Sequence, residues 1–438
     1  GAPPALSLLF LTAPEERRFL VRRADSPLVF LVSERRAEAL LPPRARLSRA
    51  PGSKRWRCAR RRSPRRPCRW RTPVKKTALL TGAAGKIGRY VIGALSRRGF
   101  EVVATDMTSK GVPLDVRFEH CDLTSGAAVD RLVGLVKPDV LVHCAAVVAP
   151  IAYVEPELAE AVNLGGTQHL IDAMKAHSPD GFVVFVSSYA AFGPCGPRDA
   201  VRRPTDPCYP DDNYGLQKLT AESWLSHSGL RQCSLRLGAV LDMQDLMPSH
   251  PCYRPFVFMV SLEQPEHGVD VRDVARAIAS AAAVQPDGHV LLIGGDDSWK
   301  LPARGLRRDI FGAIGLPLPP ERAFRPNPDP LRNEGWFYES WMDTTHSEEL
   351  LRFQRVTHDV FMRELRKLKK RQRVALAPLR PIVSRTMTLL SPYLGRNAMP
   401  AGVTVWDDIC RVFDVPAGIA RTRSSMPPPP SPFAAHPS

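Results

Sequence analysis

Two side chains that can move a proton stand four residues apart, Tyr214 and Lys218. The apolar positions of residues 220–225 predict a helix through them, and residues i and i+4 share one helical face. A phenol is a poor base because its ordinary pKa is about 10, but a nearby ammonium group favours phenolate and lowers that pKa. The pair therefore predicts an acid/base centre for an alcohol–ketone couple, with Lys218 lowering the pKa of Tyr214.

Two hydroxyl groups come directly after a buried apolar run at residues 182–186. Ser187 or Ser188 would stand at the carboxyl end of this predicted strand, where a hydroxyl can donate a hydrogen bond to a substrate oxygen as charge develops. The spacing Tyr-x-x-x-Lys also occurs in ordinary surface pairs. Here the spacing indicates a catalytic pair because these serines and a glycine pattern further upstream accompany it.

A glycine-rich turn, TGAAGKIG at residues 81–88, joins a short apolar run to a helical pattern. Gly82 would permit the tight turn, Gly85 would let a diphosphate approach the backbone, and Gly88 would allow close packing of helix on strand. The free N–H groups at the start of the helix would then face phosphate oxygens. The strand–turn–helix context is what such a pattern requires to indicate a dinucleotide site.

An acidic residue, Asp106, ends the next apolar run, 24 residues after Gly82. A carboxylate there accepts hydrogen bonds from ribose hydroxyls and repels a 2′-phosphate, so the pattern favours NAD over NADP. Lys86 and Arg89 lie near the predicted phosphates and keep NADP open as the less favoured cofactor. Asp122 either binds the adenine amine or caps the following helix.

Apolar runs alternate with helical patterns from residue 77 onward. The predicted strands are residues 77–81, 102–105, 140–143 and 182–186, and the predicted helices include residues 90–95, 129–136 and 158–174. Strands that are apolar throughout are typical of sheets covered on both faces. The alternation predicts an α/β fold, a Rossmann-like doubly wound parallel sheet that binds its ligand at the carboxyl ends of its strands.

In these features residues 74–355 resemble the extended short-chain dehydrogenase/reductase family, in its NAD-dependent epimerase/dehydratase group. The matching motifs are the glycine turn, DVLVHCAA at 139–146, NLGGT at 163–167, SSYAAFG at 187–193 and YGLQK at 214–218. The resemblance implies Tyr214 as acid/base, Lys218 also on the nicotinamide ribose, Ser188 beside the reacting oxygen and Asn163 supporting the active-site backbone. We favour a packed core imidazole for His143.

The predicted catalytic residues are thus Ser188, Tyr214, Lys218 and Asn163. The predicted cofactor-binding residues are Gly82, Gly85, Lys86, Ile87, Gly88, Asp106, Asp122, Leu123, Ala145, Ala146, Tyr214 and Lys218, and no metal site is expected. The family's sugar-nucleotide dehydratases carry Thr-Asp-Glu where this chain has Ser188-Tyr189-Ala190. Dehydration is therefore disfavoured.

Three functions stay open from the sequence. The first is an NAD-dependent oxidoreductase or epimerase acting on an alcohol–ketone centre, for which a nucleotide sugar is one candidate substrate. The second is an enzyme like 3β-hydroxysteroid dehydrogenase acting on a hydrophobic alcohol, and the third is a non-enzymatic dinucleotide-binding regulator. A cavity rich in arginine, with Arg236, Arg254 and Arg272 as candidates, would favour the sugar, and an apolar cavity the hydrophobic alcohol.

Composition and the resemblance divide the 438 residues into five parts. These are a basic disordered extension at 1–73, an NAD-binding core at 74–240, a substrate-binding part with returning sheet elements at 241–355, a basic amphipathic helical segment at 356–395, and a mostly disordered Pro/Ser-rich tail at 396–438. We expect the aromatic side chains of residues 336–341 mainly to pack in the core of the substrate-binding part.

The basic charge is concentrated at one end of the chain. Residues 1–72 contain 19 Lys or Arg and five Asp or Glu, and so carry +14 of the formal net charge of +17. This flank shows no pattern of a known nucleic-acid module, so we expect no specific nucleic acid as partner. An organellar targeting segment is an alternative because the flank is rich in arginine, although Glu15, Glu16, Glu34 and Glu38 oppose it.

The remaining expectations concern location and partners. Nine cysteines without paired spacing indicate a reduced compartment, and no apolar run is long enough to cross a bilayer, so we expect a cytoplasmic protein without a spanning helix. A homodimer stays open beside the small-molecule substrate. The amphipathic stretch at 361–376 either rests on an anionic membrane or packs on its own domain with a solvated basic face.

Overall fold

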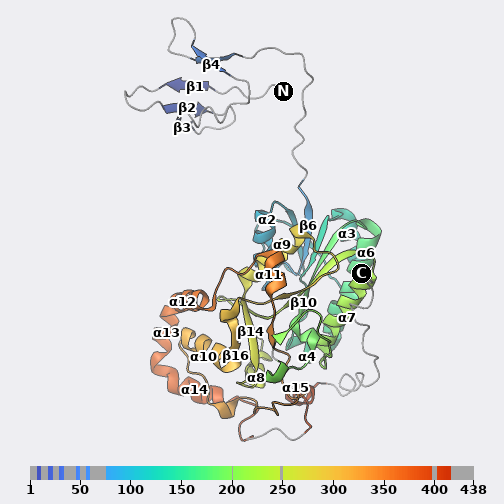
Figure 1. Cartoon of the computed structure of the whole chain (residues 1–438), viewed down its shortest axis with the longest axis vertical. Coiled ribbons are helices and arrows are strands. Elements are labelled where there is room, and N and C mark those ends of the chain that lie inside the picture. The colour runs from blue at the N-terminus through green and yellow to red at the C-terminus, as the bar shows by residue number, and fades with distance from the viewer. Residues whose placement is uncertain are drawn as a thin grey trace. The chain divides into compact units, whose positions relative to one another are not determined.

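The computed structural model describes residues 75–199, 201–246, 250–396 and 402–415, together with five short strands between residues 7 and 59 (Figure 1). The chain divides into two units, Gly1–Pro73 and Val74–Ser438. In the first unit the strands are β1 (Ser7–Phe10), β2 (Arg18–Arg22), β3 (Val29–Ser33), β4 (Arg46–Arg49) and β5 (Trp56–Ala59). β1, β2 and β3 pair antiparallel, as do β4 and β5, and the rest of the predicted disordered extension lies outside the described residues.

The second unit is built on a parallel sheet of seven strands in the order β15-β12-β10-β9-β6-β7-β8. Their bounds are β6 (Thr77–Thr81), β7 (Glu101–Asp106), β8 (Arg117–His120), β9 (Val140–His143), β10 (Phe182–Ser188), β12 (Arg231–Leu237) and β15 (Val290–Ile293). The chain starts in the middle at β6, moves outward to β8 and returns through β9. The doubly wound Rossmann-like sheet predicted from the sequence is therefore confirmed.

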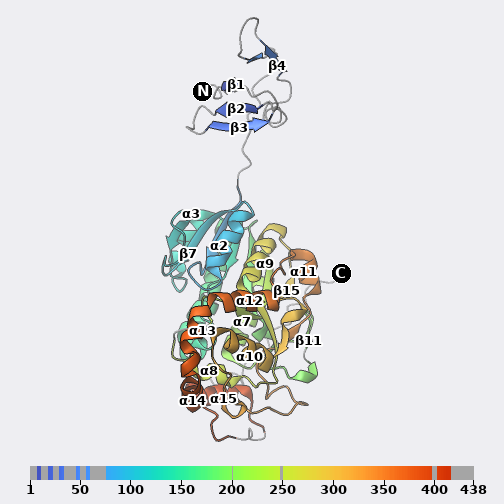
Figure 2. The same ribbon diagram turned by 90° about the vertical axis from the view of Figure 1, so that its left-hand side faces the viewer.

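Helices cover both faces of this sheet, as Figures 1 and 2 show. One face carries α2 (Gly88–Arg97), α9 (Val271–Val284) and α11 (Thr345–Leu351), and the other carries α3 (Gly126–Val136), α6 (Gly166–His177) and α7 (Asn213–His227). Successive residues of a strand face opposite layers, so Leu80 packs with the first group and Leu79 with the second. This burial on both faces explains why the strands are apolar throughout.

The predicted helix at residues 158–174 is interrupted in the structure. It consists of α5 (Pro156–Glu160), a π-helical turn at Ala161–Gly165 and α6. The apolar spacing continues through all three, which is why the sequence pattern did not reveal the interruption. Asn163, a residue of the candidate site, lies within this π-helical turn.

A smaller part follows the sheet and contains β13 (Ala239–Leu241), β14 (Pro265–Asp270) and β16 (Lys300–Pro302) in one sheet, with β14 in the middle. Strands β11 (Val201–Arg202) and β17 (Trp341–Met342) pair beside it. Its helices include α4 (Ile151–Val154), α8 (Tyr253–Met259) and α10 (Ala303–Ile314). Trp299, Leu306 and Ile314 form part of its core.

The predicted basic helical segment forms three helices, α12 (His358–Leu368), α13 (Lys370–Leu376) and α14 (Arg380–Leu389). Phe361, Met362 and Leu365 of α12 are buried in the core of the smaller part, so α12 packs on its own domain. The structure corrects the expectation of a mostly disordered tail for residues 402–415, because α15 (Val405–Phe413) buries Val405 and Ile409 there. Residues 416–438 lie outside the described residues.

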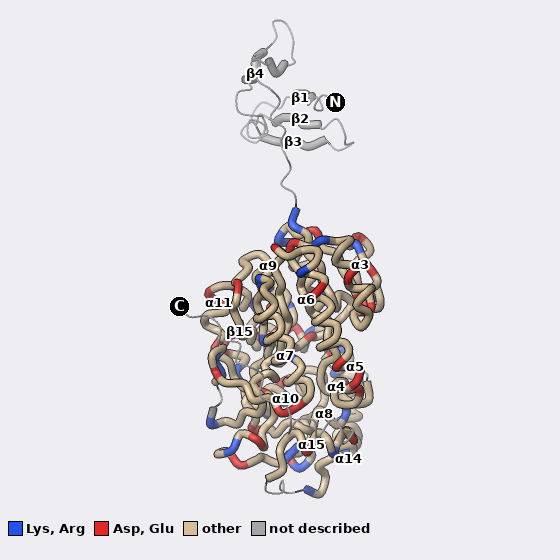
Figure 3. Tube along the Cα trace, turned by 90° about the vertical axis from the view of Figure 1, so that its right-hand side faces the viewer, with Lys and Arg blue, Asp and Glu red and all other residues tan. Residues whose placement is uncertain are grey.

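Along the backbone of the second unit, Lys and Arg positions are interspersed with Asp and Glu positions (Figure 3). None of the seven cysteines among its described residues forms a disulfide bond there. Within the described parts of the chain, no helix has both the length and the apolar character needed to cross a bilayer.

Candidate active site

A cavity of about 890 Å³ opens at the carboxyl edge of the sheet, next to β6, β7, β9, β10 and β12. Its lining includes every residue that the sequence predicts to bind the cofactor, from the glycine turn to Ala146, Tyr214 and Lys218. Of the four predicted catalytic residues, Ser188, Tyr214 and Lys218 line it, and Asn163 lies behind it. The topology thus brings segments that are far apart in the sequence to one site.

The glycine turn has the backbone that its sequence predicts. Gly82 has φ of +68°, and a Cβ there would lie 2.6 Å from the backbone nitrogen of Ala145. A Cβ at Gly88 would lie 2.1 Å from the carbonyl oxygen of Gly82, so only glycine permits this approach of helix α2 to the turn. Both positions exclude any side chain for a steric reason, whereas Gly85 is less crowded.

Asp106, at the end of β7, orders the nucleotide end of the cavity. Its Oδ2 accepts a hydrogen bond from the backbone N–H of Ala84 at 3.0 Å, and its Oδ1 accepts one from Met107 at 2.7 Å. Lys86 does not point to open solvent: its Nζ donates to the carbonyl oxygen of Val240 at 3.1 Å, and burial lowers its pKa. Asp122 lines the cavity and accepts two hydrogen bonds from Thr124, which lower its pKa.

Tyr214 and Lys218 lie on α7, as their spacing predicts, and both are buried. Tyr214 hydrogen-bonds to Ser188, the last residue of β10. Lys218 Nζ donates to the carbonyl oxygen of Val186 at 2.9 Å and lies 5.9 Å from the centre of the Tyr214 ring. A phenol, a hydroxyl and an ammonium group therefore meet at one wall of the cavity.

The protonation of this group differs from the sequence expectation. Burial raises the pKa of Tyr214, and the hydrogen bond with Ser188 only partly offsets this effect. Burial also lowers the pKa of Lys218 to about 8. The expectation of a lowered pKa for Tyr214 is therefore wrong for this arrangement, because desolvation outweighs the contacts that favour phenolate, and the Lys218 ammonium group faces Val186.

Asn163 supports the backbone that follows β9. Its Oδ1 accepts a hydrogen bond from the N–H of Val147 at 2.8 Å, while its Nδ2 donates to the Val147 carbonyl oxygen at 2.9 Å and to Gln217 Oε1 at 2.8 Å. One amide side chain thus links the cavity wall at Val147 to helix α7 one turn from Tyr214. This contact makes Asn163 a positioning residue.

His143 is a packed core residue, as expected. Its Nδ1 lies 2.8 Å from Thr81 Oγ1 and its Nε2 lies 3.1 Å from Thr167 Oγ1. Burial lowers its pKa to about 3, so the ring is neutral at physiological pH. It does not line the cavity.

Two buried polar contacts at α7 were not predicted. Glu222 accepts hydrogen bonds from Nε and Nη2 of Arg236 and from the hydroxyl group of Ser187, so the Ser187 hydroxyl is bound to Glu222 although this residue also lines the cavity. Asp212, the N-cap of α7, accepts from Tyr153 Oη at 3.0 Å. Neither contact has a local sequence signal, because each joins residues from different elements.

The substrate end of the cavity is mostly aromatic. Its lining includes Tyr153, Tyr189, Tyr253, Phe256, Phe337 and Tyr338, together with Glu339. The aromatic side chains near residue 337 were expected mainly in the core, and they both pack there and line the cavity. Burial and the neighbouring Glu266 raise the pKa of Glu339, whose Oε2 makes no hydrogen bond with any described residue.

The three arginines named as candidates for a substrate diphosphate do not line this cavity. Arg236 is buried against Glu222, and Arg272 pairs with Asp270 and Glu364. Arg254 is exposed on α8. The idea that these residues form an anion-binding wall is therefore wrong for the described cavity.

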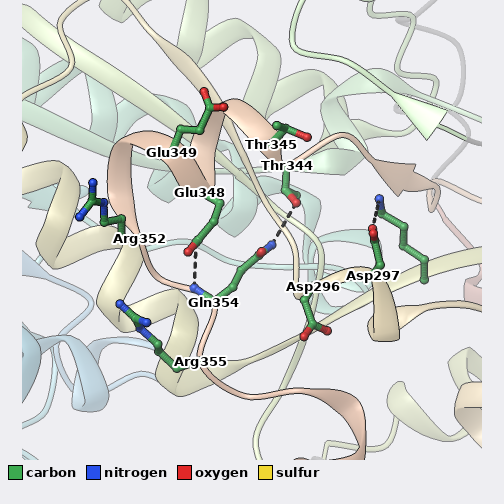
Figure 4. A pocket seen from close by; sticks show the side chains of 10 residues that line it. Asp296, Asp297, Thr344, Thr345, Glu348, Glu349, Arg352, Gln354 and Arg355 are labelled. Atoms are coloured by element: carbon green, nitrogen blue, oxygen red, sulfur yellow. Dashed lines mark hydrogen bonds and ion pairs between the residues drawn. The ribbon is translucent and has the colours of Figure 1, made fainter.

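A second hollow of about 610 Å³ lies beside α11, between Asp296, Asp297, Glu348 and Arg352 (Figure 4). Its polar groups bind one another. Gln354 Nε2 donates to Thr344 Oγ1 at 3.0 Å, and Glu348 accepts from the N–H of Gln354 at 2.9 Å. None of the residues predicted for catalysis or cofactor binding lines this hollow.

Known proteins are similar in sequence to the part of the chain that contains the larger cavity. Residues 78–241 match the model of the NAD dependent epimerase/dehydratase family. Methionine adenosyltransferase 2 subunit beta of Xenopus tropicalis is 32% identical over 179 residues, which is 40% of this chain and 50% of that protein. UDP-glucose 4-epimerase 2 of Oryza sativa subsp. japonica is 30% identical over 34% of this chain and 39% of that protein. The chain thus spans half the length or less of these curated relatives.

Solved structures share the fold over a longer stretch. The UDP-glucose 4-epimerase of Thermus thermophilus, solved in complex with NAD, matches with a TM-score of 0.56 at 24% identity, over 67% of this chain and 99% of that one. A short-chain dehydrogenase/reductase superfamily protein from Agrobacterium tumefaciens with bound NAD matches with a TM-score of 0.55 at 22% identity, over 69% of this chain and all of that one. Residues 78–241 thus match the NAD dependent epimerase/dehydratase family model, and the solved structures share the fold of the second unit.

Proposed function

We propose that this chain is an NAD-dependent enzyme that interconverts a secondary alcohol and a ketone, as a dehydrogenase or an epimerase. The observation that carries the proposal is the meeting of Tyr214, Ser188 and Lys218 at the wall of a cavity that also contains the glycine turn. A dinucleotide-binding regulator would need the glycine turn but not the buried phenol and ammonium group. The name of one relative is that of a subunit, so the regulator is the alternative that activity measurements must exclude.

The residues present fit NAD. The turn at Gly82 and Gly88 leaves no room for side chains, which keeps its backbone accessible to a diphosphate at the start of α2. Asp106 lines the cavity as a carboxylate, which suits the two hydroxyls of a ribose and disfavours a 2′-phosphate. The bound nicotinamide would supply hydride acceptance and donation.

The chain itself supplies proton transfer and orientation. Because burial raises the pKa of Tyr214, the phenol holds its proton at neutral pH and donates it to a substrate oxygen that gains charge. Ser188 orients the same oxygen through its hydroxyl group. For the reverse direction, Lys218 must stabilise the phenolate, which requires the ammonium form of a group whose pKa is lowered to about 8.

Two substrate classes have support. The relatives named UDP-glucose 4-epimerases support a nucleotide sugar, whose diphosphate normally needs cationic partners. The described cavity wall instead offers tyrosine and phenylalanine, and its cations are Lys86 and Lys218. This lining favours a hydrophobic alcohol as the second candidate. In this proposal the Oε2 of Glu339, a buried oxygen of a cavity-lining residue that no described residue binds, accepts a hydrogen bond from a hydroxyl group of a sugar substrate.

A substrate panel with NAD tests the proposal. Formation of NADH reports oxidation of a hydrophobic alcohol, whereas epimerisation recycles the cofactor and must be followed from the sugar products. On any substrate that turns over, Tyr214→Phe should lower kcat by about 10²–10⁴-fold, because it removes the transferable proton. NAD affinity, measured by calorimetry, should stay unchanged. Full turnover by Tyr214→Phe would exclude the assigned mechanism, and NAD binding without any turnover would favour the regulator.

A further inference from the structure

Residues 366–396, here called the basic strap, form an outer edge of the second unit. The strap contains the end of α12 and all of α13 and α14, which follow one another along the outside of the smaller part in Figures 1 and 2. α13 has no buried residue, and Thr388 is the only buried residue of α14. Most side chains of these two helices are exposed and therefore available to a partner.

The charge of the strap is of one sign. It contains nine Lys or Arg and no Asp or Glu. None of the nine forms an ion pair within the described residues, whereas Glu364, just before the strap, pairs with Arg272. A cluster of this size is an electrostatic surface for an anion, because no acidic neighbour neutralises it.

Large apolar side chains stand among these cations. Val374, Ile382 and Leu389 are 69%, 65% and 64% exposed, and Leu379, Leu390 and Leu394 are exposed as well. Ile382 and Leu389 are seven residues apart and share the outer face of α14 with Arg385, whereas Met387 and Thr388 face inward. Single exposed leucines are ordinary, but such a row on an outer edge marks an interaction surface.

The two ends of the chain do not offer a complement to this surface. Residues 1–72 carry a net +14, and residues 416–438 contain Arg421 and Arg423 and no acidic residue. A second copy would present the same positive strap. The occupant must therefore be an anion with an apolar layer beneath its charge, since the strap offers Leu, Ile and Val and no aromatic side chain on its outer face for stacking on bases.

We propose that the basic strap docks on the surface of an anionic lipid bilayer. Its Lys and Arg side chains would contact lipid phosphates, and the outer apolar side chains of α13 and α14 would enter the boundary between headgroups and acyl chains, as interfacial helices do. The strap packs on the part of the chain that forms the substrate end of the cavity: Met387 and Tyr393 belong to the same core cluster as Tyr214 and Tyr338. The bilayer would then lie on the side of the substrate-binding part, away from the outer strand β8.

Hydrogen–deuterium exchange of the full chain with lipid vesicles tests this proposal locally, so that binding by the basic first unit does not obscure the result. Vesicles of three parts phosphatidylcholine and one part phosphatidylserine should slow exchange in peptides from residues 370–394, and pure phosphatidylcholine vesicles should not. The double variant Ile382→Ser/Leu389→Ser keeps every charge and should lose most of this protection. The matched control, Leu114→Ser/Leu135→Ser, replaces two leucines that are exposed elsewhere on the second unit and should keep it.

Three results would overturn the proposal. One is protection confined to peptides from residues 1–73, which would assign vesicle binding to that unit. Another is equal protection of the strap in the Ile382→Ser/Leu389→Ser variant, which would remove the apolar part of the contact. The third is protection of the strap by soluble polyglutamate as strong as that by the vesicles, which would indicate an acidic protein as its partner. A melting temperature equal to that of the wild type shows that each variant is folded.

Discussion

The two ends of the active-site cavity are built in different ways. The nucleotide end comes from one strand–turn–helix unit and the strand beside it, so Gly82, Gly88 and Asp106 lie close together in the sequence. The substrate end is assembled from side chains of α4, α7, α8 and the segment before β17, which come from distant parts of the chain. The nucleotide end is defined by the close approach of helix α2 to the backbone of the glycine turn. The substrate end is defined by buried aromatic and polar side chains.

This difference implies that variants at the two ends should affect different quantities. Changes in the turn should affect NAD affinity and stability, and changes in the aromatic wall should affect the substrate. The predictions below test this separation, beginning with the largest expected effect.

Gly88→Val should abolish measurable NAD binding. The new side chain begins 2.1 Å from the Gly82 carbonyl oxygen, so α2 must move away from the turn that would hold the diphosphate. Overpacking of this kind also costs about 1–3 kcal/mol of stability. Calorimetric titration with NAD and urea unfolding measure the two effects. The control is Gly99→Val, a glycine of positive φ with no neighbouring atom within 4 Å, so the substitution strains the backbone without a steric clash and should leave NAD affinity unchanged. Equal losses of NAD affinity in both variants would contradict the role of the turn.

The rate of ketone reduction should fall as pH rises above about 8, because Tyr214 keeps its proton there while Lys218 loses its charge. Lys218 has a pKa lowered to about 8 by burial, so its ammonium form is lost above that pH and with it the charge that stabilises the Tyr214 phenolate. Each further pH unit should lower kcat/KM about tenfold if the neutral amine is inactive. Lys218→Arg, which keeps its charge at every accessible pH, should remove this limb of the profile. A limb that persists in Lys218→Arg would belong to another group.

The same lowered pKa has a consequence for stability. Between about pH 8 and the ordinary lysine value of 10.5, the unfolded chain binds more protons at this residue than the folded chain does. The contribution of Lys218 to stability therefore improves as pH rises through that window and is constant below it. In urea unfolding, the free energy of unfolding of the wild type should therefore rise with pH across this window relative to that of Lys218→Met.

Glu339→Leu should distinguish the two substrate classes. The Glu339 side chain lines the cavity with an oxygen that no described residue binds, and a substrate hydroxyl group would satisfy it. Losing one such hydrogen bond should raise KM about tenfold for a polyhydroxylated sugar. For a hydrophobic alcohol the same change should leave KM equal or lower, while NAD affinity stays constant in both cases. A change in NAD affinity would show that the two ends are not separable.

The sequence predicts the nucleotide end much better than the substrate end, and the reason is the range of the interactions. A glycine that permits a turn and a run of apolar residues that fills a buried strand are local signals, so β6, β9 and the turn were found with nearly their observed bounds. The pair of Glu222 and Arg236, and that of Tyr153 and Asp212, exist only after folding brings distant elements together. No local pattern encodes them.

Helix α15 illustrates a different kind of error. The Pro- and Ser-rich composition of the last residues led to the prediction of a mostly disordered segment from residue 396 to 438. A local signal was nevertheless present: Thr404 and Asp407 have the spacing of a capping box, and in the structure each side chain binds the backbone N–H of the other residue. Composition averaged over a long window concealed a short, well-capped helix.

The smallest predicted effect concerns the contact between this helix and the catalytic helix. Trp406 and Phe413 of α15 pack against the ring of Tyr153, at 6.0 and 5.8 Å between ring centres, and Tyr153 donates to Asp212 at the start of α7. Burial raises the pKa of Asp212 to about 7, and the Tyr153 hydrogen bond opposes this rise. Tyr153→Phe removes the donor, so it should cost about 1 kcal/mol when Asp212 is protonated and more when it is charged.

The pH dependence of that loss follows from the direction of the shift. A carboxyl whose folded pKa is raised makes the protein less stable as pH rises from about 4 to about 7, because the charge must form in a buried place. Removing the Tyr153 donor should deepen this decline, so the destabilisation by Tyr153→Phe should be larger at pH 8 than at pH 5 in urea unfolding. Tyr209→Phe, on an exposed ring, should show no loss at either pH. An equal loss at both pH values would mean that packing against α15, and not the hydrogen bond to Asp212, is what Tyr153 contributes to the substrate end.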